Sequence, residues 1–459
     1  MNPTAAEQLA YFVSGTRYED LPTDVVAKAK RHILDTFGAG LAGTTSEEAQ
    51  RARTALTASE APGAALVWGT ALRVSPRNAA LINGIAAHAF ELDDTGGCDH
   101  SGAVVLPAAV AALDLADQSV SGRQFLVAVV LGYDLGRRVL EGFGGYKPHN
   151  EAGWHSTGTC GTFGAAGAAA HVLGLDERRS ASAIALAASF SSGLWAFIHD
   201  GAMAKRVHAG RAAEGGLLAA LFAAQGITGP MQVFNDGWGG FFKTFGHAET
   251  DPAALTRDLG AQWRICRAAI KPHASCRDTH AAVDAVGRVL DRERLSVRDL
   301  AAIRVRANSF LAGMVGGRTV DTLPAAQMSL PYAVAARTVL GTAGLSAYTE
   351  IRRSDPVLRM MLDRVFLDID ETVAASDCSS VTFVLTDGRR IEEPTTAAFG
   401  APQNPISDTA LISKFEELAG LVMKPSDIRR LVETTLALDE LSDVRDLVCL
   451  LGHPPNEAR

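Results

Sequence analysis

Apolar residues at helical spacing dominate the first half of the chain. Pro22-Thr23-Asp24 is a typical start signal, and the apolar positions Val25, Ile33 and Phe37 behind it fall near a period of about 3.6 residues. Because strand signals are nearly lacking, we expect residues up to about 265 to be all-helical. The same pattern predicts helices at 76–84, leading to His88, and at 104–116, 124–140, 162–173, 177–188 and 211–225.

The pattern changes after residue 270. Residues 300–307 alternate between apolar and polar side chains, as in a half-buried strand. Residues 380–385 and 389–392 flank Asp387-Gly388, a strong signal for a hairpin turn. Helical patterns at 282–289 and 329–340 lie between these strands, and residues 407–451 are helical again.

These patterns predict a mainly α fold with two domains. We expect a large all-helical domain at residues 1–268, to which residues 400–459 return, and a smaller α+β domain at 269–399. The smaller domain has a size usual for a folding unit, and we interpret it as a lid over the helical body.

Composition narrows the class of protein. The 459 residues are 47% apolar and 20% charged, and the net charge of −8 includes no Lys/Arg stripe, so we expect no nucleic-acid partner. Residues 1–8 lack the basic and apolar regions of a signal peptide, and no apolar run is long enough for a membrane span. The six cysteines are scattered without a CxxC pair. We therefore expect a soluble cytoplasmic protein.

Several common catalytic motifs are missing from the sequence. It contains no HExxH, P-loop, GxSxG, or GxGxxG behind a strand, which disfavours a zinc hydrolase, an NTPase, an esterase and a dehydrogenase. Cys98 and Cys276 are possible nucleophiles without a local signature, and a small buried thiol is the more common role.

Four stretches combine ionisable residues with small neighbours. The first, Gly153 to Gly164, places His155 before a run of glycines and hydroxyl residues that opens a tightly packed helix, where free amide donors favour an anion. The second, Glu91 to His100, ends a helix with acidic residues, including Asp93, beside Thr95 and a glycine-bearing loop. These carboxylates either orient a histidine or lysine or form a solvated helix end.

The other two stretches are basic. Lys205, His208 and Arg211 recur every three residues, so we expect them to share a helix face directed at an anion rather than at solvent. The fourth stretch, Lys271-Pro272-His273 and the residues up to His280, lies where the helical body gives way to the α+β unit. Such cations hold carboxylates, and one base removes a proton next to one of them.

Together these stretches resemble the MmgE/PrpD family, whose members include 2-methylcitrate dehydratase, cis-aconitate decarboxylase and iminodisuccinate epimerase. The resemblance covers nearly the whole chain and keeps the order of its motifs. The motifs are Asn83-Gly84, His88, Leu92-Asp93-Asp94-Thr95, His100-Ser101-Gly102-Ala103-Val104, Gly153-Trp154-His155, the stretch from Lys205 to Ala213, Lys271-Pro272-His273, and Ser329-Leu330-Pro331-Tyr332.

The resemblance implies a homodimer in which each site lies between a large helical domain and a smaller α+β lid, with no metal or organic cofactor. It also assigns site residues. The implied catalytic residues are His155, His100, Lys205, Asp93 and Tyr332, and the implied substrate-binding residues are Lys271 and Thr95. We also expect His208 and Arg211, from their spacing with Lys205, and Cys276, from its place in the fourth stretch, to bind substrate.

The expected chemistry is cofactor-free proton abstraction next to a carboxylate of a small di- or tricarboxylate. Dehydration is the first expectation, because Cys276 occupies the place where the decarboxylase branch of the family has a functional histidine, and because the loop from Thr95 to His100 is shorter than in that branch. An epimerase and a cis-aconitate decarboxylase are alternatives. A non-catalytic helical binding protein is an alternative of a different class.

Overall fold

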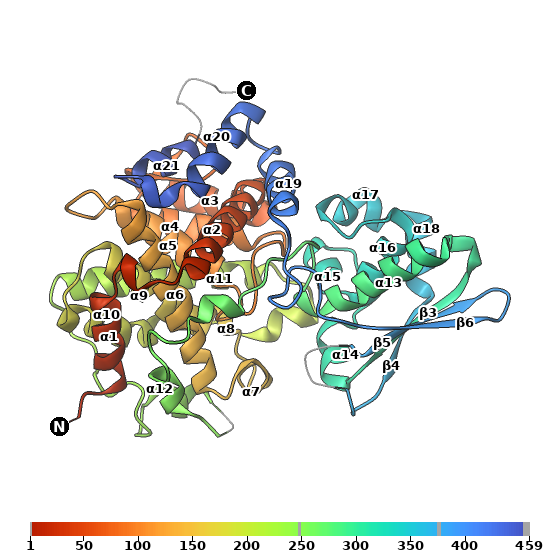
Figure 1. Ribbon diagram of the computed structural model, residues 1–459, viewed down its shortest axis with the longest axis horizontal. Coiled ribbons are helices and arrows are strands. Elements are labelled where there is room, and N and C mark those ends of the chain that lie inside the picture. The colour runs from red at the N-terminus through yellow and green to blue at the C-terminus, as the bar shows by residue number, and fades with distance from the viewer. Residues whose placement is uncertain (1, 247–248, 374–377, 453–459) are drawn as a thin grey trace.

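The structure, a computed structural model, describes residues 2–246, 249–373 and 378–452 (Figure 1). The fold is mainly α, with a large helical domain and a smaller α+β domain. The larger domain contains α1 (Ala5–Gly15), α2 (Thr23–Gly43), α3 (Glu47–Ser59), α4 (Pro76–His88), α5 (Gly102–Leu113), α6 (Gly122–Gly142), α7 (Tyr146–Glu151), α8 (Ser156–Thr159), α9 (Gly161–Val172), α10 (Glu177–Ala187), α11 (Ala204–Ala224) and α12 (Phe241–Phe245).

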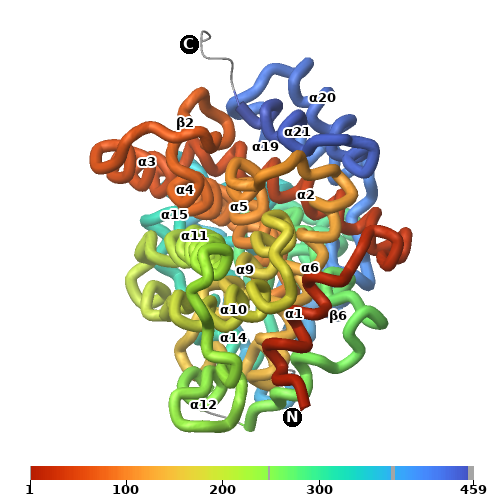
Figure 2. The backbone as a smooth tube through the Cα atoms, turned by 90° about the vertical axis from the view of Figure 1, so that its left-hand side faces the viewer, coloured from red at the N-terminus to blue at the C-terminus, as the bar shows by residue number. Residues whose placement is uncertain are grey.

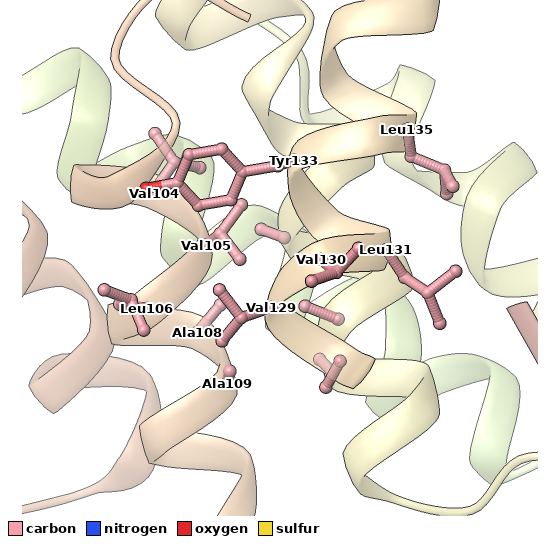
Figure 3. Packing of buried hydrophobic residues seen from close by; sticks show 14 of the residues in the cluster. Val104, Val105, Leu106, Ala108, Ala109, Val129, Val130, Leu131, Tyr133 and Leu135 are labelled. Carbon is pink, nitrogen blue, oxygen red and sulfur yellow. The ribbon is translucent and has the colours of Figure 1, made fainter. Parts of the chain in front are cut away.

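The core of the larger domain is built from small and β-branched side chains. Figure 3 shows Tyr133 of α6 lying against Val104 and Val105 of α5, and Val129 of α6 beside Ala108, whereas Leu135 points away from α5 to the other side of α6. These residues are all buried, so α6 has apolar contacts on two faces. Helix α9 packs on α6, and α11 packs on both α4 and α9. Small side chains allow these helix axes to come close together.

The smaller domain lies to the right in Figure 1. It contains α13 (His280–Glu293), α14 (Ser309–Val315), α15 (Leu323–Gln327), α16 (Leu330–Leu340), α17 (Glu350–Arg353), α18 (Pro356–Asp363), β3 (Leu300–Ala307), β4 (Val365–Ile369), β5 (Ser380–Leu385) and β6 (Arg390–Pro394). The strand order is β4-β3-β5-β6, in which β3 and β4 are parallel and the other neighbours are antiparallel.

The predicted strand at 300–307 and the hairpin at Asp387-Gly388 are both present. The Leu385 amide donates to the Arg389 carbonyl at 2.9 Å, and Gly388 has a φ of 89°, which favours glycine. Strand β4 was not predicted, because its outer residues Phe366 and Ile369 are exposed and disturb the alternation.

The expectation of an all-helical first part needs one correction. β1 (Ala65–Leu66) and β2 (Arg73–Val74) form a short antiparallel ribbon there. Each strand is only two residues long, too short for a periodic pattern to reveal.

The C-terminal segment returns to the larger domain. Figures 1 and 2 both place α19 (Asp408–Ala419), α20 (Pro425–Leu436) and α21 (Arg445–Leu450) on the side of α2. Phe415 of α19 packs against Gly38 of α2, where a Cβ atom would lie 2.9 Å from its ring. The largest buried cluster reaches Ile270 and resumes at Ile406, and the next largest extends mainly between Ala274 and Ala398. We propose the domain boundaries at this division.

Candidate active site

Ionisable side chains converge near the end of α4, where the connection from α4 to α5 lies close to the first turn of α11. Helices α4 and α11 approach each other closely, because a Cβ atom on Gly84 of α4 would lie 2.8 Å from the Cα atom of Gly210 in α11. The converging side chains are His88, Glu91, Asp93, Asp99, His100, His155, Lys205, Arg206 and Lys271.

Glu91 is surrounded by three cationic side chains. Its buried carboxylate accepts hydrogen bonds from Lys205 and Arg206 of α11 and, at 3.1 Å, from Lys271. Its φ of 55° is rare for a side-chain-bearing residue. Burial opposes the charge of Glu91, but the three cations outweigh it and hold the pKa well below its usual value. The carboxylate is therefore ionised and keeps the cations in place.

Asp93 orients two imidazoles. Its Oδ2 atom lies 2.9 Å from Nδ1 of His88 and 3.1 Å from Nδ1 of His100, and its Oδ1 atom lies 3.5 Å from the Lys271 ammonium. Burial opposes its charge, yet the two histidines and Lys271 hold its pKa well below the usual value. A carboxylate at Nδ1 fixes the Nδ1–H tautomer and leaves Nε2 for chemistry.

The pKa values of His100 and His88 are shifted in opposite directions, although both imidazoles contact Asp93. Burial disfavours the charged form of His100, but Asp99 and Asp93 outweigh burial and raise its pKa. Nε2 of His100 lies 3.6 Å from a carboxylate oxygen of Asp99. For the more deeply buried His88, burial prevails and lowers the pKa to about 3. His100 therefore carries the proton near neutral pH, and His88 does not.

His155 caps α8 and is fully buried. Its Nδ1 atom lies 3.1 Å from Nδ1 of His208, and its ring contacts Trp195 edge-on. Nε2 has no hydrogen-bond partner in the described part of the chain and lies 3.8 Å from Asp99. Burial, followed by the charge of Lys205, lowers the pKa of His155 well below its usual value. His155 is therefore a neutral imidazole with Nε2 available.

A cavity of about 600 Å³ opens beside these groups, between the two domains. Its walls include Asp99, His100 and Lys205 from the larger domain and Cys276 and Arg277 from the smaller one. A volume of this size is usual for a small-molecule site. The other residues of its wall are Thr95, Gly96, Gly97, Arg137, Leu140, Tyr146, Trp195, Cys266, Arg267, Ala269, Asp278, Ala401, Pro402 and Gln403.

Four of the predicted site residues line this cavity: Thr95, His100, Lys205 and Cys276. His155 and Asp93 are fully buried behind its wall, next to the lining residues Asp99 and His100. Thr95 donates to Asp99 at 3.3 Å, and Cys276 lines the cavity from the smaller domain, where burial raises the pKa of the thiol to about 12. His208 lies behind His155. Lys271, predicted to bind substrate, is fully buried against Glu91 and Asp93 instead of lining the cavity.

The structure does not bring two predicted residues to the site. Tyr332 lies in the core of the smaller domain, and its hydroxyl donates to the Ala347 carbonyl at 2.7 Å. Arg211 pairs with Glu214 at the surface. Three-residue steps along a helix do not keep one face, because each advances about 300°, so Arg211 lies about 120° around α11 from Lys205.

Sequence reasoning did not assign roles to His88, Glu91, Asp99 and Arg206. Glu91 and Asp99 belong to the predicted acidic cluster, and both adopt positive φ values, of 55° and 120°, that the local sequence pattern does not indicate. His88 belongs to the motifs of the resemblance but received no role beyond its place near the end of a helix, and it is the last residue of α4. No local signal distinguishes a buried histidine from an exposed one at a helix end.

The three imidazoles of His88, His100 and His155 are the candidates for metal ligation within the described residues. Their nearest ligand nitrogens lie within 4.8 Å of one another. The ammonium groups of Lys205 and Lys271 occupy the same region, and repulsion from Lys205 contributes to the low pKa of His155. Ammonium groups so close to the imidazoles repel a metal cation.

Comparisons with known proteins agree with this architecture. Residues 7–253 match the MmgE/PrpD N-terminal domain, and residues 273–440 match the MmgE/PrpD C-terminal domain. The cis-aconitate decarboxylase-like protein oryM of Aspergillus oryzae is 30% identical over 475 residues, covering 97% of this chain and 96% of that protein.

Two further relatives are similar over nearly their whole length. The cis-aconitate decarboxylase of Aspergillus terreus is 29% identical, covering 97% of this chain and 96% of that protein, and the cis-aconitate decarboxylase of Homo sapiens is 26% identical, covering 99% and 96%. Within the described residues, no helix has both the length and the apolar character needed to cross a bilayer. Because the two domain matches span most of the sequence, the chain belongs to the MmgE/PrpD family.

Proposed function

We propose that the chain is a cofactor-independent acid–base lyase that removes water from a small di- or tricarboxylate. The observation that carries the proposal is the pair His155 and His100, whose pKa values are shifted in opposite directions within one site. Their ring centres are 6.2 Å apart. Two titratable groups whose pKa values are shifted in opposite directions are suited to act as base and acid at the same pH.

In the proposed reaction, Nε2 of His155 removes the proton next to a carboxylate, and Lys205 stabilises the enolate-like charge that develops on it. His100 then gives its proton to the leaving hydroxyl. A C–H and a C–O bond break, a C=C bond forms and water leaves. Asp93 holds the ring of His100, and Lys271 acts through Glu91 and Asp93 rather than by touching substrate.

Decarboxylation is the second candidate, because the curated relatives named above are called cis-aconitate decarboxylases or decarboxylase-like proteins. In that reaction a C–C bond breaks, carbon dioxide leaves, and His100 protonates the remaining carbanion. Decarboxylation therefore needs a proton donor but no base, whereas dehydration needs both. The presence of a neutral base beside the charged acid favours dehydration.

Proton NMR in D₂O with citrate, 2-methylcitrate and cis-aconitate tests the proposal. Dehydration converts citrate into an alkene with a new vinyl signal, converts 2-methylcitrate into an alkene with a vinyl signal or an allylic methyl singlet, and releases no carbon dioxide. Loss of carbon dioxide from cis-aconitate without such conversion would replace the proposal by decarboxylation. Exchange of the α-proton without elimination would indicate an epimerase, for which the panel also includes an aspartate-derived acid. A protein that changes none of these acids would be a binding protein.

The homodimer and the cytoplasmic location implied earlier stay predictions. Light scattering of the purified chain measures the first, and a fluorescent fusion in the source cell shows the second. Neither is needed for the chemistry proposed here, because every group in it comes from one chain.

A further inference from the structure

Arginines from both domains line the outer part of the cavity. Arg137 of α6 and Arg267 belong to the larger domain, whereas Arg277 belongs to the smaller one. The proposed reaction uses none of them. Arg137 and Arg267 also line an adjoining hollow of about 410 Å³, so they lie where the cavity continues towards the surface.

The two arginines of the larger domain share one carboxylate with a third. Glu141 accepts from Nε of Arg137 and Nε of Arg264, each at 3.0 Å, and lies 3.8 Å from Nε of Arg267. Three guanidinium groups therefore surround a single carboxylate. Burial, and after it repulsion from Arg137, lowers the pKa of Arg267. Positive charge exceeds negative charge at this end of the cavity, which favours an anionic ligand.

Arg277 faces these groups from the smaller domain. Its half-buried side chain forms no hydrogen bond and no ion pair with any residue that the structure describes. Two carboxylates line the same cavity, Asp99 and Asp278. Asp99 faces the imidazoles of His100 and His155, deeper in the cavity. A guanidinium that lines a cavity without a partner is suited to bind a carboxylate through two parallel hydrogen bonds.

We propose that Arg277, together with Arg137 and Arg267, forms a second anion subsite that binds the substrate carboxylate farthest from the reacting carbon. Lys205 holds the carboxylate next to that carbon, and the arginines hold the distal one. The subsite selects polycarboxylates over acids that lack a distal carboxylate, and it bridges the two domains when occupied. This inference rests on the proposed function, since it names the substrate class of the same site.

Calorimetric binding of two unreactive acids tests the subsite. Tricarballylate has a distal carboxylate, and ethylsuccinate replaces that carboxylate with a methyl group. We expect the wild-type chain to bind tricarballylate more tightly. Arg277→Gln should weaken tricarballylate binding by about 10- to 100-fold, because a charge-assisted pair is lost, and leave ethylsuccinate binding unchanged. Arg267→Gln should weaken it less, because that side chain is 60% exposed.

The matched control is Arg298→Gln, which removes an exposed arginine of the same domain that lines neither hollow. It should leave both affinities unchanged. Arg277→Lys, which keeps the charge but not the paired donors, should bind tricarballylate with an intermediate affinity. A thermal melt of each variant shows that it is folded. Equal affinities of wild type and Arg277→Gln for tricarballylate, or an equal loss for both acids, would overturn the subsite.

The two proposals can fail separately, because binding of these acids needs no turnover. A chain that discriminates between them through Arg277 but converts no acid in the NMR panel would keep the subsite and lose the proposed function. A chain that dehydrates hydroxy acids with the same KM in wild type and Arg277→Gln would keep the function and lose the subsite.

Discussion

Glu91 and Asp93 each contact a different set of side chains in the site. Glu91 neutralises cations, whereas Asp93 accepts a hydrogen bond from His88 and pairs with His100, whose Nδ1 also lies 2.8 Å from the Asp94 carbonyl. Both carboxylates are fully buried, where an unpaired charge costs several kcal/mol. This pairing explains how ammonium groups and imidazoles stay close together inside the protein, and it sets which imidazole is protonated.

The pH dependence of turnover follows from the two histidines. Neutral His155 is available at every pH above its lowered pKa, whereas protonated His100 is lost as the pH rises through its raised pKa. We therefore expect kcat/KM to be flat from mildly acid to neutral pH and to fall on the alkaline side. Steady-state rates on the best acid of the NMR panel, measured from pH 5 to 9, check this expectation.

Substitutions show which histidine causes the alkaline decline of that profile. His155→Gln and His100→Gln should each lower turnover by about 10²–10⁴-fold, and His100→Gln should also remove the alkaline decline. His171→Gln is the control, since this histidine bonds the Val13 carbonyl far from the cavity and should keep the wild-type profile. An unchanged alkaline limb in the His100 variant would remove His100 from the role of acid.

At the scale of elements, the site depends on how closely α11 approaches α4. Helix α4 ends at His88, and α11 carries Lys205 in its first turn. Glycines at the crossing bring the two backbones together, since a Cβ atom on Gly210 would lie 2.3 Å from the Leu81 carbonyl oxygen. The separation between the end of α4, at His88, and Lys205 in α11 therefore depends on residues that carry no side chain.

Gly210→Ala should separate the two helices. The added methyl group meets backbone, which cannot rotate away, so we expect a loss of about 1–3 kcal/mol in the free energy of unfolding and a fall in kcat. Urea titration and steady-state kinetics measure both. Gly313→Ala is the control, because this glycine also lies within a helix and a Cβ atom there has open space. That variant should be as stable as wild type or slightly more so.

Equal stability and kcat in the Gly210 variant and wild type would show that α11 can move without disturbing the site.

At the scale of the molecule, the returning C-terminal segment supports the site from outside. Lys414 of α19 donates to Asp35 of α2 and to the carbonyl of Leu92, each at 2.6 Å. Leu92 lies between Glu91 and Asp93, so a helix more than 300 residues later in the sequence holds the backbone of the active-site connection. Both domains and the return segment are thus needed to place the charged groups.

The whole molecule should lose stability in mild acid. Burial lowers the folded-state pKa of seven histidines, so below pH 6.5 the unfolded chain binds protons that the folded chain does not. Each contributes at most about 1.4 kcal/mol per pH unit between its two pKa values. The raised pKa of His100 acts in the opposite direction. The seven are His32, His88, His149, His155, His171, His208 and His280.

Urea midpoints at pH 7.5, 6.5 and 5.5 measure this loss, which should steepen below 6.5. The variant His171→Gln should show a shallower slope than wild type, because one proton fewer is taken up on unfolding. A midpoint that does not change between pH 7.5 and 5.5 would contradict the assignment of these histidines as neutral.

Local sequence was sufficient for much of the fold and for part of the site. Periodicity predicted the long helices and the strand at 300–307, and the glycine-bearing stretches pointed to His100, His155 and Lys205. It did not show that Arg211 turns away to Glu214, or that Tyr332 donates to a backbone carbonyl inside its own domain. The direction of a side chain depends on neighbours that the local pattern does not contain.

The sequence by itself determined the helical body, the α+β insertion and the family. Hydrophobic periodicity, turn residues and the order of motifs depend only on residues that are close together in the sequence. Only the tertiary structure decided which groups carry charge. The pKa values of His100 and His155 depend on burial and on carboxylates and ammonium groups brought from separate segments. The subsite around Arg277 likewise exists only because two domains face one cavity.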